Sequence, residues 1–191
     1  MPRPDHYLSR RANWQHEGLK KASKSEQDVF DLLDTIVDSE KYIVDIKPKD
    51  AKGLYMEAYR ARALDAVEAR VLRQCGIIPE LSITNRATGK KIFLEVKHQQ
   101  DAGNAHERAG KYFAPGIVRR LKKIGKLKTF PVFFIFVGDI VDGPRSAKYI
   151  AELSTWFDDP SVKDRFLLWY NRDKDLLRDY FEKCIKPAID D

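Results

Sequence analysis

Two acidic side chains and a lysine between residues 79 and 108 have the types and spacing that phosphodiester hydrolysis needs. Glu80 follows a proline just before a short apolar run, and Glu95 and Lys97 stand two residues apart near the end of a second run. Carboxylate oxygens are ligands that Mg²⁺ prefers, and bound Mg²⁺ can lower the pKa of a water and stabilise the leaving oxygen. A neighbouring amine can orient that water and offset charge in the transition state.

The run that carries Glu95 and Lys97 has the pattern of a β-strand. Apolar residues alternate with these two side chains, which is the period of a strand with one buried face. Polar turn residues 85–90 separate it from an apolar run at 81–84, so the two runs predict a β-hairpin. A hairpin of that length would bring Glu80, at the start of its first strand, close to Glu95. The alternating apolar residues are Ile92, Leu94 and Val96.

Two further acid-x-lysine triplets show that this pattern is weak on its own. They are Asp45-Ile46-Lys47 and Asp50-Ala51-Lys52. The first follows strand-like residues, but Pro48 ends that run and no proline–acid pair precedes it; the second lies in a predicted polar loop. Each triplet taken singly is more typical of a solvated ion pair than of a catalytic site. Only Glu95 combines a predicted strand with the upstream pair Pro79-Glu80.

A third segment, Gly103-Asn104-Ala105-His106-Glu107-Arg108, follows Lys97 at short range. Together with Pro79-Glu80 and Glu95-Val96-Lys97, it resembles the type II restriction endonucleases of the EcoRI/MunI group, within the PD-(D/E)xK nuclease superfamily. The resemblance is strong over residues 79–116 and weaker elsewhere. It implies a restriction-endonuclease-like fold and a Mg²⁺-dependent homodimer that cuts both strands of a palindromic DNA site with an AATT core, leaving 5′ overhangs with 5′-phosphate ends.

The resemblance also implies a role for each residue of the motif. Glu80 and Glu95 would bind the metal, and Lys97 would position the attacking water. Glu107 would pair with an arginine across the dimer and support the surface that reads the bases. A cognate DNA methyltransferase is expected in the host. The implied DNA-binding residues are Gly103, Asn104, Ala105 and Arg108.

The chemistry of Asn104 and Glu107 allows two interpretations. An asparagine side chain can bond N6 and N7 of adenine together, and an arginine such as Arg108 is a good bidentate donor to purines. Asparagine followed three residues later by glutamate is also a capping box at the start of a helix. On the residues alone the helix cap is favoured, whereas the resemblance favours base reading.

Two positions depart from the family pattern. Glu80 stands where the family usually has aspartate, and the extra methylene moves the carboxylate by roughly a bond length. The link 98–102 is shorter than in the relatives, and Ala102 takes the place of a MunI-like arginine. We expect activity to survive the first change. After the second, the outer bases are read differently or not at all, so a bare AATT site is favoured over a longer AATT-centred palindrome.

Length and composition limit the kinds of protein to which this chain can belong. A chain of 191 residues with 43% hydrophobic content can bury one core, so we expect one domain over 1–191 with a basic arm over 1–24. A net charge of +6 suits a polyanionic partner such as double-stranded DNA. Cys75 and Cys184 match no metal or redox spacing, and no apolar run approaches the ~20 residues of a membrane span. These features predict a cytoplasmic protein without a membrane segment.

The hydrophobic pattern predicts helices and strands around the hairpin. The run 130–139 is apolar almost throughout, which predicts a strand covered on both faces at the centre of the sheet. The alternation of elements predicts an α/β fold with a mixed central β-sheet flanked by helices. The predicted helices cover 23–37, 54–75, 105–128 with a break near Pro115, 145–157, and 173–185 before Pro187. A further strand is predicted over 41–46, and residues 165–170 are predicted to be a strand or a buried segment.

The predicted helix 105–128 carries the densest basic patch in the chain. Contact with phosphate and plain solvation explain this patch equally well. Its apolar residues Ile117, Leu121 and Ile124 would face inward. The basic residues are Arg119, Arg120, Lys122, Lys123, Lys126 and Lys128.

Two other functions stay open on the sequence. A DNA-binding protein of the same fold without cleavage is suggested by Glu80 in the aspartate position. A structure-specific repair or recombination nuclease would keep Glu80, Glu95 and Lys97 and would not need Asn104. Incubation of plasmid with and without Mg²⁺ separates cutting from binding.

Overall fold

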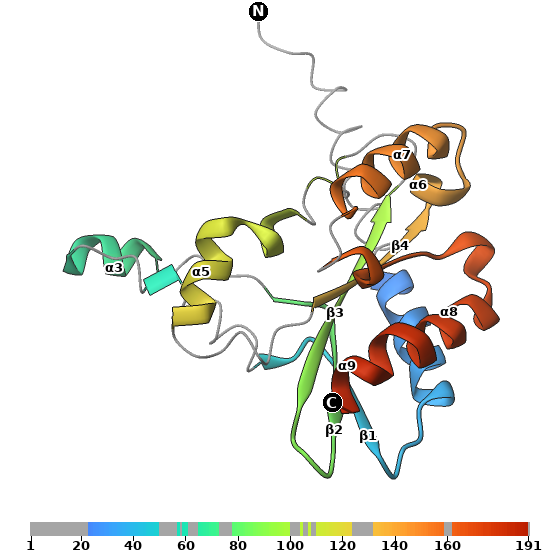
Figure 1. Ribbon diagram of the computed structural model, residues 1–191, viewed down its shortest axis with the longest axis horizontal. Coiled ribbons are helices and arrows are strands. Elements are labelled where there is room, and N and C mark those ends of the chain that lie inside the picture. The colour runs from blue at the N-terminus through green and yellow to red at the C-terminus, as the bar shows by residue number, and fades with distance from the viewer. Residues whose placement is uncertain are drawn as a thin grey trace, which may run out of the picture.

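A five-stranded β-sheet with helices on both faces forms the centre of the protein (Figure 1). The computed structural model describes residues 23–49, 57, 59–60, 65–72, 78–99, 104, 107, 110–123, 132–158 and 162–190. Strands β1 (Tyr42–Ile46), β2 (Leu81–Asn85) and β3 (Lys91–Gln99) are antiparallel neighbours, whereas β4 (Val132–Gly138) and β5 (Phe166–Leu168) run parallel to β3. The predicted mixed sheet with flanking helices is confirmed.

The predicted hairpin is present as β2 and β3. Leu81 faces Leu94 across the pair, so the strands have the register that their apolar alternation predicts. At the turn, the side-chain carbonyl of Asn85 accepts the backbone N–H groups of Ala87 and Thr88 at 2.9 and 3.2 Å. Gly89 then takes the left-handed backbone conformation, at φ 68°, that glycine adopts without strain. Turn chemistry and burial therefore specify the same register.

The middle strand of the sheet is β3, so the prediction that residues 130–139 lie at its centre is wrong. β3 has two strands on each side, because the three-residue strand β5 lies beyond β4. The prediction of only one buried face on β3 is also wrong, since Glu95 is 1% exposed. Alternation along one strand does not reveal which distant segments cover its polar face. β4 is buried on both faces, as predicted.

Two apolar layers cover the two faces of the sheet. Alternate residues of β4 divide between them, with Phe133 and Ile135 in one layer and Phe134 and Phe136 in the other. The first layer packs against the helix 23–36 and the C-terminal helices, which lie side by side in Figure 1. The second packs against η1 (Gly110–Phe113), α5 (Pro115–Lys123), α6 (Asp139–Asp142) and α7 (Ser146–Trp156). Short 3-10 turns η3 (Lys163–Arg165) and η4 (Tyr170–Arg172) flank β5.

The C-terminal helix does not stop before Pro187, contrary to the prediction. Helix α8 (Lys174–Tyr180) continues through a π-helical turn, η5 (Phe181–Ile185), into α9 (Lys186–Asp190). In this wider turn the backbone N–H of Lys186 donates to the carbonyl of Phe181, five residues back. Pro187 follows directly after this turn and lacks the N–H that the next helical hydrogen bond would need. A local change of helix type thus accommodates a residue that usually ends a helix.

The predicted continuous helix 54–75 is interrupted at Asp65. Residues 57, 59 and 60 are helical, but Asp65 is a bend and α3 (Ala66–Leu72) begins after it. The Asp65 carboxylate accepts the backbone N–H of Glu68 at 2.8 Å, which is a helix N-cap contact. Aspartate competes for backbone N–H groups in this way, so it starts a new helix inside a helical pattern. No helix in the described ranges has the length and apolar character required to cross a bilayer.

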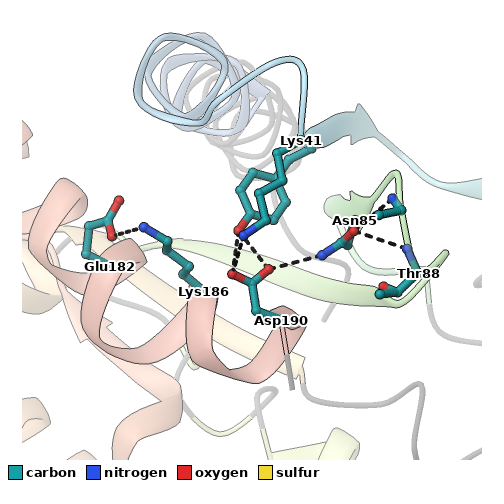
Figure 2. Close-up of polar contacts among 8 residues, drawn as sticks. Lys41, Asn85, Thr88, Glu182, Lys186 and Asp190 are labelled. Carbon is teal, nitrogen blue, oxygen red and sulfur yellow. Dashed lines mark hydrogen bonds and ion pairs between the residues drawn. The ribbon is translucent and has the colours of Figure 1, made fainter.

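The carboxylate of Asp190 joins the C-terminal helix to the start of β1 and to the turn after β2 (Figure 2). It accepts hydrogen bonds from the Tyr42 hydroxyl at 2.8 Å, the Lys41 ammonium at 2.7 Å and the Asn85 amide at 3.1 Å. The ring of Tyr42 is buried and packs edge-on against Phe181, with ring centroids 5.8 Å apart. One carboxylate therefore ties β1, the turn after β2 and α9 together.

We expect Asp190→Ala to lower the free energy of unfolding by about 1 to 2 kcal/mol, because the buried Tyr42 hydroxyl loses its acceptor. Urea denaturation monitored by circular dichroism measures this change. Asp179→Ala is the matched control, since Asp179 pairs with Lys183 on the exposed side of the same helical run and should leave the midpoint unchanged. Equal midpoints for the two variants would contradict the role of Asp190.

Candidate active site

The register of the hairpin places Glu80 and Glu95 at facing positions. Leu81 pairs with Leu94 at the end of the ladder, and continuing this register by one position sets Glu80, a bend residue just before β2, opposite Glu95. Side chains at facing positions of an antiparallel pair lie on the same face of the sheet, with Cβ atoms about 4.5 to 5.5 Å apart. Glu80 is half-buried beside the fully buried Glu95. The fold therefore brings together the two carboxyl groups that the sequence analysis singled out.

Each oxygen of the Glu95 carboxylate has its own donor. The Lys97 ammonium donates to Oε1, and the Tyr112 hydroxyl donates to Oε2. Such partners are what a buried carboxylate requires, and Glu95 is 1% exposed. The sequence analysis predicted that Lys97 lies beside Glu95 but missed Tyr112. No spacing rule links a tyrosine in a 3-10 turn to a strand residue 17 positions earlier.

Negative charge is in excess around Glu80. Burial, the charge of Glu95 and the charge of Glu26, in that order, raise the pKa of Glu80 from 4.5 to about 7, while Lys97 and Lys47 act in the opposite direction. The backbone of Glu80 is held in place by Lys47, whose N–H donates to the Glu80 carbonyl at 2.6 Å. The two lysines near this carboxyl group therefore only partly offset the effects of burial and of the neighbouring negative charges on its pKa.

The first turn of the helix 23–36 borders this pair of carboxylates. Glu26 Oε2 lies 3.6 Å from the Lys47 ammonium, and the Glu26 side chain is 12% exposed. The adjacent Ser25 hydroxyl makes a 2.9 Å hydrogen bond with Nδ1 of His98, which follows Lys97 on β3. The sequence pattern offered no reason to place this helix at the site, and it favoured a solvated pair for Lys47. Both contribute to the electrostatics of the site.

Two carboxylates with unbalanced charge are a donor set suited to a hard divalent cation. Burial and the charge of Glu95 both disfavour the charged form of Glu80 and raise its pKa, and a cation bound to both carboxylates would offset these effects. Among the described residues, no three His, Cys, Asp or Glu side chains form a ready metal-binding group. A cation held by Glu80 and Glu95 would complete its shell with water and phosphate oxygens, as Mg²⁺ commonly does.

Comparison with known proteins assigns a family to this arrangement. The family described as type II restriction enzyme MunI matches residues 4–190. The chain belongs to this family. A type II restriction enzyme MunI from Mycoplasma sp. is 30% identical over 205 residues, which cover 96% of this chain and 98% of the relative. The chain is thus a type II restriction endonuclease, an enzyme of the site-specific deoxyribonuclease class.

A solved structure supports the same conclusion. The crystal structure of MunI restriction endonuclease in complex with cognate DNA matches this chain with a TM-score of 0.66 and 28% identity. The match covers 93% of this chain and 97% of the solved one. The mixed five-stranded sheet with flanking helices in this chain therefore has the fold of a MunI-like restriction endonuclease.

The residues expected to read DNA in this MunI family member are only partly described. Asn104 and Glu107 are exposed, and Glu107 is helical. Gly103, Ala105 and Arg108 lie outside the described residues. The choice between a helix cap and base reading at Asn104 stays a prediction.

Helix α5 carries the described part of the predicted basic patch. It begins at Pro115, where the break was predicted, and Ile117 and Leu121 face inward as expected. Arg119 and Lys123 are exposed, whereas the guanidinium of Arg120 donates to the carbonyl of Gly116 at 2.8 Å. Ile124, Lys126, Lys128 and the side chain of Lys122 lie outside the described residues. Two exposed cations of this helix therefore remain available to an anionic partner.

Glu80→Gln should stabilise the metal-free protein at alkaline pH. The pKa of Glu80 is raised in the folded state, so its contribution to stability is full below pH 4.5 and is lost as the pH rises through about 7. Glutamine stays uncharged at every pH, so the variant does not lose stability as the pH rises. We expect its free energy of unfolding at pH 8 to exceed that of the wild type by about 1 to 2 kcal/mol, allowing for the partial exposure of the side chain. Thermal unfolding in EDTA at pH 4.5 and pH 8 measures it.

The exposed Glu40 provides the control for this comparison. Glu40→Gln should change stability by the same small amount at both pH values. A Glu80→Gln protein that is no more stable than wild type at pH 8 would show that the carboxylate is well compensated in the folded chain.

Proposed function

We propose that this restriction endonuclease is a Mg²⁺-dependent homodimer that cuts both strands of a palindromic DNA site with an AATT core. It would leave 5′ overhangs that carry 5′-phosphate ends. The observation that carries the proposal is the facing placement of Glu80 and Glu95, with Lys97 bonded to Glu95. We further propose that it acts in the cytoplasm alongside a cognate DNA methyltransferase.

Glu80 and Glu95 would hold the metal through their facing carboxylates. When bound, Mg²⁺ supplies polarisation of the phosphoryl group, a lowered pKa of a bound water and stabilisation of the leaving oxygen. Enclosure of Glu95 in the protein strengthens its attraction for cations relative to a carboxylate in water. The longer side chain of Glu80 compared with aspartate would be accommodated by its half-buried position.

Lys97 would position the attacking water and offset charge on the phosphate. It lies two residues after Glu95 on the same face of β3, about 6 to 7 Å along the strand. Its side chain is 14% exposed, so the ammonium can reach a substrate bound at the surface. The water oxygen forms a bond to phosphorus and gives up a proton to solvent, the bond to the 3′ oxygen breaks, and that oxygen takes up a proton to leave a 3′-hydroxyl and a 5′-phosphate.

The exposed Asn104 would read the central bases together with Ala105 and Arg108, while Gly103 would let the backbone approach the DNA. Glu107 would pair with an arginine of the second subunit. A two-fold symmetric dimer presents identical reading surfaces to the two halves of a palindrome and cuts each strand once.

Plasmid incubation with and without Mg²⁺ tests the proposal, with Lys97→Ala as the diagnostic variant. We expect discrete fragments from the wild type only when Mg²⁺ is present, and sequencing of the fragment ends should find AATT at the cleavage site. Lys97→Ala should bind the same fragments in gel shifts while cutting roughly 10² to 10³-fold more slowly. Lys91→Ala, at the other end of β3, should cut at the wild-type rate.

Three outcomes would count against the proposal. Cutting by Lys97→Ala at the wild-type rate would remove that lysine from the mechanism. Gel shifts without fragments from the wild type would indicate a binding protein that has lost cleavage. Cutting only at branched or nicked DNA would indicate a structure-specific nuclease.

Asn104→Ala should lose site preference, because the side chain that would bond the adenine edge is removed. We expect cutting of the AATT site to slow by about 10 to 100-fold, from a loss of about 1 to 3 kcal/mol of discrimination. Sequencing of cleavage ends from random DNA measures the preference. An unchanged profile of sites would assign Asn104 to capping the following helix.

A further inference from the structure

We propose that Tyr112 is a positioning residue, whose hydroxyl holds the Glu95 carboxylate in the orientation that binds metal. The inference rests on the proposed function, since it takes Glu95 as a metal ligand. Tyr112 would not touch the substrate and would act through Glu95 alone.

The contact is built from two separate parts of the fold. Tyr112 lies in η1 and is 4% exposed, and its hydroxyl donates to Oε2 of Glu95 in the middle strand. The ring packs edge-on against Phe134 of β4, with centroids 5.4 Å apart and an interplanar angle of 73°. Phe134 pairs with Glu95 in the parallel register of the two strands. Phe134, the strand neighbour of Glu95, therefore holds the ring of Tyr112 in place.

The two donors to Glu95 are suited to different tasks. Lys97 holds Oε1 in the free protein, but its ammonium is also the group expected to turn toward water and phosphate. The Tyr112 hydroxyl is enclosed and can remain on Oε2 when the lysine turns away. A carboxylate oxygen has two lone pairs, so it can accept this hydrogen bond and still ligate a cation. The tyrosine would therefore fix the carboxylate throughout the reaction.

Packing alone does not account for a tyrosine at this position. Phe113, the next residue, packs against the same Phe134 ring at 5.3 Å without a hydroxyl. The hydroxyl of Tyr112 instead meets the most buried carboxylate of the candidate active site. Partners that orient metal ligands in this way typically change metal affinity or activity by about 10 to 100-fold.

Tyr112→Phe, with Tyr180→Phe as the matched control, tests the inference. Both remove one buried phenol oxygen, but only the first changes a contact to Glu95. We expect Tyr112→Phe to bind Mn²⁺ about 10 to 100-fold more weakly than wild type in electron paramagnetic resonance titrations without DNA. DNA affinity in EDTA should be unchanged. The Mg²⁺ concentration that gives half-maximal cutting should rise by a similar factor, while Tyr180→Phe matches wild type throughout.

A double-mutant comparison shows whether Tyr112 acts through Glu95. In a Glu95→Gln background, Tyr112→Phe should have no further effect on Mn²⁺ binding, because its acceptor is already altered. An equal additional loss in that background would overturn the inference. If Tyr112→Phe does not melt cooperatively, Phe134→Leu takes its place, since it removes the ring that anchors Tyr112 and leaves the Glu95 side chain intact. Weaker Mn²⁺ binding by this variant, with no further loss in the Glu95→Gln background, supports the inference, and Mn²⁺ affinity equal to wild type overturns it.

The outcomes separate this inference from the proposed function. A wild-type protein that cuts no DNA in Mg²⁺ contradicts the nuclease mechanism itself. A wild type that cuts, with Tyr112→Phe equal to Tyr180→Phe in Mn²⁺ affinity and Mg²⁺ dependence, overturns only the role of Tyr112.

Discussion

The antiparallel register between β2 and β3 is the constraint on which the candidate active site depends. Because Leu81 faces Leu94, Glu80 faces Glu95, and a slip of one residue would turn Glu80 to the opposite face of the sheet. Asn85 fixes the turn between the two strands of the hairpin. The N–H of Lys47, just after β1, holds the Glu80 carbonyl on the other side of β2. The relative placement of two carboxylates is thus determined by backbone hydrogen bonds, with side-chain contacts refining it.

Burial of that pair leaves the negative charge of Glu80 incompletely compensated. The helix 23–36 brings Glu26 close to Glu80, and η1 covers Glu95 with Tyr112. Removal of water makes each uncompensated negative charge unfavourable, and the same removal strengthens attraction to positive charge. Functional sites commonly keep such unfavourable charge at some cost in stability. The Asp190 contacts at the far end of the hairpin illustrate the opposite case, since each donor there has a matching acceptor.

The sequence predicted the hairpin, and it missed contacts with distant segments and two local departures from the helical pattern. Alternation along residues 91–97 and the turn chemistry at Asn85 were sufficient for the hairpin and the approach of Glu80 to Glu95. Coverage of Glu95 by Tyr112 could not be read from any period, because it joins a strand to a 3-10 turn. The bend at Asp65 and the continuation of the helix through Pro187 follow from local hydrogen bonds that override an apolar pattern. The order of strands around β3 is likewise a property of the whole sheet.

The position of Tyr112 along the chain has a consequence for making chimeric enzymes within the family. Tyr112 follows Glu107 by five residues, so the segment proposed to read bases and the residue proposed to orient Glu95 belong to one short stretch. An exchange of residues 103–108 alone would join a foreign segment to the native η1. A crossover placed after Phe113 transfers both together, so that the segment proposed to read bases and the residue proposed to orient Glu95 come from the same enzyme.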